Sequence, residues 1–139
     1  MCRAFYLATD SPVALIPWNN AAPEFNVVPL SEVDSTVLSQ FSKPSVVYVG
    51  AHTGCSCGFF PEDEDDARAL ESAERLRAFL ARVIAEQGDA EFFACWEGDQ
   101  NVPPGEKVEL SPSEFDGERL GYVEPPWWAH VRLTGREDR

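Results

Sequence analysis

The chain has 139 residues, of which 24 are acidic and 11 basic, and its formal net charge at pH 7 is −13. This length suits one domain with its own core, so we expect residues 1–139 to form a single α+β domain. The acidic excess argues against nucleic acid as a partner, because such binding draws its affinity from Lys and Arg. It also opposes binding to anionic membranes.

Two further absences in the sequence indicate where the protein works. No apolar run approaches the ~20 residues that a membrane span needs. The first residues also lack the apolar stretch of a secretory signal. We therefore expect a cytoplasmic protein with no membrane partner, whose protein or small-molecule partner the sequence does not identify.

Extended segments dominate the first fifty residues. Residues 3–9 and 45–50 have the apolar, β-branched and aromatic composition of strands. Residues 25–30 also predict an extended segment, which Pro29 marks as an edge or a strand end. Residues 31–41 predict a helix, because Ser31 and Asp34 resemble a capping box and apolar side chains at 33, 37, 38 and 41 share one α-helical face.

The longest helix is predicted from the acidic run at residues 62–66 to about Gln87, where Gly88 is suited to end it. Its apolar side chains form one stripe, at 67, 70, 73, 76, 79, 80, 83 and 84. Strands are predicted at 90–96, 107–110 and 129–133, and a short capped helix at 112–116.

These elements do not alternate strictly as strand and helix, which favours an α+β fold over an alternating α/β fold. We predict a mixed or antiparallel sheet of about five to six strands. One long helix and one or two short helices are expected to pack on one face of this sheet.

One segment carries a chemical signature, the sequence HTGCSCG at residues 52–58, between a predicted strand and the long helix. His52, Cys55 and Cys57 offer an imidazole and two thiols, a donor set that suits zinc. Zinc needs a fourth ligand, and Cys2 is favoured if the first strand neighbours the strand at 45–50. The other candidates have simpler explanations, Cys95 as a core residue and His130 as a hydrogen-bonded strand residue.

Two alternatives for this segment stay open. Cys55 and Cys57 could serve redox chemistry through a strained disulfide. They could instead be buried thiols in a glycine-rich turn, with His52 hydrogen-bonded and no metal. In each case Gly54 and Gly58 are expected to let the loop fold back through positive φ angles.

A third function class is a non-enzymatic interaction module. Its binding surface would combine the acidic charge with exposed Trp127 and Trp128, because tryptophan is enriched where proteins bind each other. The sequence assigns no catalytic residue and no organic cofactor, and it leaves open whether the protein is an enzyme.

Overall fold

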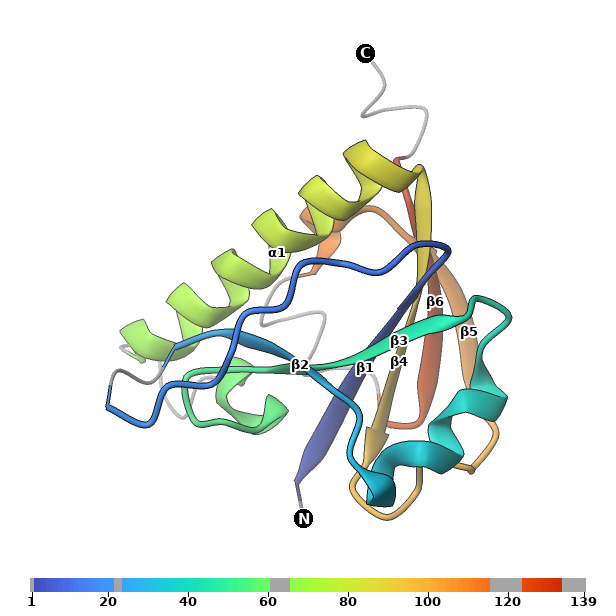
Figure 1. The fold of residues 1–139 in the computed structure, drawn as a ribbon, viewed down its shortest axis with the longest axis horizontal. Coiled ribbons are helices and arrows are strands. Elements are labelled where there is room, and N and C mark those ends of the chain that lie inside the picture. The colour runs from blue at the N-terminus through green and yellow to red at the C-terminus, as the bar shows by residue number, and fades with distance from the viewer. Residues whose placement is uncertain (1, 22–23, 61–65, 116–123, 134–139) are drawn as a thin grey trace.

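A mixed sheet forms the centre of the protein (Figure 1). The structure is a computed structural model that describes residues 2–21, 24–60, 66–115 and 124–133. Its strands lie in the order β2-β3-β1-β4-β6-β5, and all neighbours are antiparallel except β5 and β6. The strands are β1 (Arg3–Thr9), β2 (Asn26–Pro29), β3 (Ser45–Gly50), β4 (Asp89–Trp96), β5 (Glu106–Leu110) and β6 (Trp127–Arg132). The predicted α+β fold is confirmed, and the sheet, predicted as mixed or antiparallel with about five to six strands, is mixed and has six.

Helices cover both faces of the sheet. The long helix α1 (Ala67–Gln87) packs on one face together with two short 3-10 helices, η2 (Ser56–Phe59) and η3 (Pro112–Glu114). A longer 3-10 helix, η1 (Glu32–Gln40), lies against the other face (Figure 1). None of the helices in the described ranges is long and apolar enough to cross a membrane.

Neighbouring side chains of the central strands enter two different cores. Phe5 and Phe92 point into the main core under α1, whereas Tyr6 and Phe93 point into a smaller core that includes Val37 of η1. Successive strand residues face opposite sides of a sheet, so both faces of β1 and β4 must be apolar. This explains why these strands appear in the sequence as continuous apolar runs.

The predicted helix at 31–41 is present but is a 3-10 helix, and its predicted apolar face is wrong. Val37 is fully buried, whereas Val33 is 80% exposed and Leu38 is 50% exposed. A 3-10 helix has three residues per turn, so side chains at the spacing of an α-helix do not all lie on the face that packs against the core. The predicted capping box is confirmed, since both the backbone N–H and the hydroxyl of Ser31 donate to Asp34.

Helix α1 follows the prediction except in its first turns. The stripe from Leu76 to Ile84 is buried as expected, but Leu70 is 51% exposed and the polar Ser72 is buried in its place. Gly88 ends the helix with φ 90°. Residues 62–65 of the acidic run, residue 116 of the predicted short helix and the tail at 134–139 lie outside the described residues.

The free side of β2 is partly covered by the segment that precedes it. Ile16 exchanges two backbone hydrogen bonds with Val27, each 2.9 Å long, and this single bridge is all that the apolar run 13–16 contributes to the sheet.

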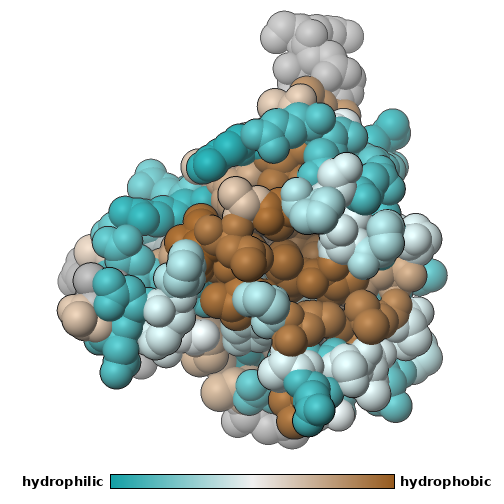
Figure 2. Space-filling view, in the orientation of Figure 1, coloured by the Kyte–Doolittle hydropathy of each residue, from teal (hydrophilic) through white to brown (hydrophobic). Residues whose placement is uncertain are grey.

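Hydrophobic side chains gather on the face of the molecule shown in Figure 2. A shallow groove of about 290 Å3 lies beside β2 and β3, and it is lined by Pro12, Val13, Leu15, Pro29, Leu30, Ser45, Val46 and Val47.

Candidate metal site

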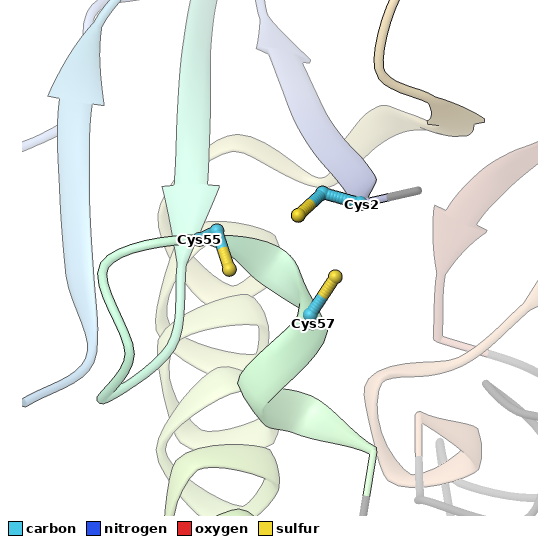
Figure 3. A group of neighbouring side chains, drawn as sticks. All are labelled: Cys2, Cys55 and Cys57. Carbon is cyan, nitrogen blue, oxygen red and sulfur yellow. The ribbon is translucent and has the colours of Figure 1, made fainter.

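The pairing of β1 with β3 brings three cysteines together. The two strands are antiparallel with Phe5 opposite Val49, so the start of β1 lies beside the end of β3. Cys2 precedes β1, and Cys55 and Cys57 lie in the loop and 3-10 turn that follow β3. The three Sγ atoms lie within 4.8 Å of one another, and Figure 3 shows them facing a common space. We call these three residues the thiol cluster.

Ser56 fixes the two loop cysteines against the sheet. Its hydroxyl accepts a hydrogen bond from the Phe5 N–H (2.9 Å) and donates one to the Val49 carbonyl (2.8 Å). Its own N–H donates to the Tyr48 hydroxyl (3.1 Å). The serine is fully buried, so these bonds are shielded from water. Sequence analysis missed Ser56 and Tyr48, because nothing local distinguishes this serine from a solvated loop residue.

The two glycines of the loop act differently from each other. Gly54 has φ +87°, a left-handed conformation that favours glycine, and it confirms the predicted turn. Gly58 does not have a positive φ, so the prediction is wrong there. It is needed for close packing instead, because a Cβ atom would lie 2.6 Å from the Thr53 hydroxyl and 2.8 Å from the Ala51 Cβ.

The sulfur atoms of the thiol cluster lie in unequal environments. Burial raises the pKa of Cys57 to about 11; the backbone N–H of Arg3, which donates to this sulfur at 3.1 Å, lowers it, and the neighbouring thiols Cys2 and Cys55 raise it. Burial also opposes ionisation of Cys55. There, hydrogen bonds from the Thr53 hydroxyl, the Cys57 N–H and the other thiols prevail and lower the pKa of Cys55 below its ordinary value. Of the two loop cysteines, Cys55 is therefore the one that ionises first.

A cation lies beside the thiol cluster at the start of β1. The guanidinium carbon of Arg3 is 4.0 Å from the centre of the Phe60 ring and 4.9 Å from that of Trp96. Its Nε atom is buried and has no hydrogen-bond partner. Arg3 therefore brings a positive charge, held by two aromatic rings, to the end of the sheet where the thiols converge.

His52 does not join the thiol cluster, although sequence analysis placed it in the ligand set. Its Nδ1 lies 2.9 Å from the Ser72 hydroxyl, and its backbone N–H donates to the same oxygen at 3.2 Å. Burial and the nearby Arg68 lower the pKa of His52. The ring lines a separate polar cavity of about 230 Å3, together with Glu24, Phe25, Arg68, Glu71, Ser72 and Arg75.

The other two candidate ligands have the structural roles expected of them. Cys95 is fully buried in the smaller core, and this burial raises its pKa to about 12. His130 lies on β6 with its Nε2 2.7 Å from a carboxylate oxygen of Asp89. Among the described residues, the thiol cluster is the only group of three or more His, Cys, Asp or Glu side chains whose ligand atoms lie within 4.8 Å of one another.

The two adjacent tryptophans do not form the exposed pair that an interaction module would use. Trp127 is 2% exposed and stacks on Phe92 in the main core, so the expectation of its exposure is wrong. Trp128 is partly exposed, stacks on His130 and has the Lys107 ammonium 5.7 Å from its ring centre. An apolar groove lies beside β2 and β3 instead.

Comparison of the chain with models of known protein families, with curated proteins and with solved structures finds no match. The thiol cluster is the arrangement in the described residues that could bind a metal ion.

Proposed function

We propose that the protein is a metal-binding domain in which Cys2, Cys55 and Cys57 hold a zinc ion. The observation that carries this proposal is the convergence of three thiols, within 4.8 Å of one another, from two separate parts of the chain. Thiolate sulfur is a soft ligand, and zinc is one of the few ions that it selects.

The surroundings of the thiol cluster support bound thiolates. A zinc ion with three thiolates carries a net charge of −1, which the Arg3 cation would offset. The backbone N–H groups of Arg3 and Cys57 donate hydrogen bonds to sulfur atoms of the cluster. Such hydrogen bonds are stronger when the acceptor is charged, so they favour thiolates. Buried Ser56 holds the loop in place before any metal binds, so little ordering would accompany binding.

The thiol cluster supplies three of the four ligands that zinc usually takes. Three protein ligands with water in the fourth position are typical of catalytic zinc, whereas four protein ligands are typical of structural zinc. We therefore expect an exchangeable fourth ligand, and His52, held by Ser72, is not expected to supply it.

The first test is the metal content and free-thiol count of protein purified without chelator or a metal-affinity column. We expect about one zinc per chain, with about three thiols protected from alkylation until chelator is added. Cys55→Ser should lose the zinc, and Cys95→Ser, outside the thiol cluster, should retain it. Protein that binds no added zinc, and whose three cluster thiols react without chelator, would contradict the proposal.

A second variant separates the ligand set of the structure from the set predicted by the sequence. His52→Ala should retain zinc in the same ratio, because the histidine is bonded to α1 rather than to the thiol cluster. Loss of zinc from folded His52→Ala protein would instead favour the ligand set of His52 with three cysteines.

A further inference from the structure

We infer that the thiol cluster is also a redox switch, in which a hydroperoxide converts two of the thiols to a disulfide and the metal ion is released. The inference rests on the proposed function, because it concerns the same three sulfur atoms. It changes the redox prediction made from the sequence, since Cys2 joins the pair of loop cysteines as a reactant.

The geometry makes bound zinc and a disulfide mutually exclusive. All three Sγ atoms lie within 4.8 Å of one another, so each pair is a small movement from the S–S bond length of about 2.05 Å. A disulfide removes two of the three sulfur ligands, and the remaining thiol cannot hold zinc alone. The three cysteines are partly exposed and can meet a small peroxide, whereas Cys95 is fully buried.

The disulfide is expected to include Cys2. Cys55 and Cys57 are two residues apart at the start of η2, so a bond between them would close a very short ring. Short rings distort the preferred disulfide geometry and weaken the bond. Cys2 approaches from the start of β1, a separate segment, and can pair with either loop cysteine without closing such a ring.

The reaction balances with one peroxide. One cysteine sulfur attacks the peroxide O–O bond and becomes a sulfenic acid, while the other oxygen leaves as an alcohol or water. A second sulfur attacks the sulfenic sulfur, the S–S bond forms and water leaves. Two thiolates lose two electrons and the peroxide gains them. With hydrogen peroxide, the zinc site takes up three protons and yields Zn²⁺, one disulfide, one thiol and two waters.

The test adds one equivalent of hydrogen peroxide to the zinc-loaded full chain and follows three quantities. These are zinc release to a chromophoric chelator, the number of free thiols, and disulfide linkage in a tryptic digest under non-reducing conditions. We expect one zinc released, two of four thiols lost, and the peptide of residues 1–3 linked to that of residues 4–68. Dithiothreitol should restore both thiols and zinc binding.

Matched variants identify the reacting sulfur atoms. Cys95→Ala should behave like the parent protein, and Cys2→Ser should lose the link between the two peptides. Zinc that stays bound after peroxide, or thiols that end as sulfinic acid without that link, would overturn the inference.

The same peroxide treatment of the metal-free chain separates the inference from the proposed function. If it forms the Cys2 disulfide but never binds zinc, the proposed function and the release of metal both fail, and only the disulfide chemistry stands.

Discussion

Ser56 shows how one buried hydroxyl can determine the geometry of a site that it does not enter. Its hydrogen bonds reach Phe5 on β1 and both Tyr48 and Val49 on β3, the two strands that bring the cysteines together. The serine lies between Cys55 and Cys57, so any movement of its backbone moves both sulfur atoms. We therefore regard Ser56 as a positioning residue of the thiol cluster.

Replacing Ser56 with alanine should weaken both the fold and the site. The variant leaves the buried Phe5 N–H without its acceptor, which costs about 1–3 kcal/mol of the free energy of unfolding. We expect zinc affinity to fall about tenfold, with all three cysteines still present. Urea unfolding of metal-free protein and a zinc competition titration measure the two effects. Ser35→Ala, at an exposed serine of η1, is the control and should change neither.

Three of the four ligands predicted from the sequence lie together, and the reason for the exception is tertiary. The spacing of His52, Cys55 and Cys57 places them in one loop, and strand pairing decides whether Cys2 can reach it. The direction of the His52 ring depends on Ser72 of α1, which no pattern within residues 52–58 reveals. The sequence could therefore predict donor types but not which side chains converge.

At the scale of elements, strands were predicted better than short helices. β1, β3 and β4 are dense in β-branched and aromatic residues, and their predicted bounds agree with the structure to within a residue. Helix η1 contains Ser, Thr, Asp and Val, which have weak preference for the α-helix, and it forms a 3-10 helix. The order of strands depends on contacts between distant residues, so it could not be read from the sequence.

Two glycines offer a matched comparison between a loop and a helix end. Gly54 in the cysteine loop has φ +87°, and Gly88 after α1 has φ +90°. Alanine in this conformation is strained, so Gly54→Ala and Gly88→Ala should each lower the free energy of unfolding by about 1–2 kcal/mol. Only Gly54→Ala should also weaken zinc binding, because only this strain lies within the loop. Equal zinc affinities in the two variants would show that the turn does not position the thiols.

At the scale of the whole molecule, the thiol cluster and the charged group around Asp89 lie at opposite ends of the sheet. The thiol cluster lies where β1 starts and β3 ends. At the opposite end of the sheet, Asp89 begins β4 and accepts hydrogen bonds from His130 (2.7 Å) and Lys43 (2.9 Å). These two partners, His130 first, lower the pKa of Asp89 below its ordinary value of 3.8. In a chain with net charge −13, one carboxylate thus holds both a lysine and a histidine.

This carboxylate should make stability depend on pH in the acid range. A folded-state pKa below the unfolded value stabilises the protein above the unfolded pKa, and this contribution disappears as the pH falls through the folded pKa. Asp89 is partly exposed, so we expect Asp89→Asn to lower the free energy of unfolding at pH 7 by no more than about 1 kcal/mol. The difference from the parent protein should shrink toward pH 3.

Urea unfolding at pH 7, 5 and 3 measures this dependence. Glu74→Gln removes an exposed carboxylate of α1 and serves as the charge-matched control. A deficit for Asp89→Asn that is as large at pH 3 as at pH 7 would assign the effect to packing rather than to ionisation.

The outer side of β2 limits how molecules of this protein can assemble. Val27 already uses its outward N–H and carbonyl on Ile16. The next residue facing outward, Pro29, has no N–H to donate. A strand from another molecule would therefore find no continuous row of donors and acceptors there, despite the apolar groove beside it. The β2 edge is therefore a poor template for the strand addition by which an exposed hydrophobic edge strand grows into fibres.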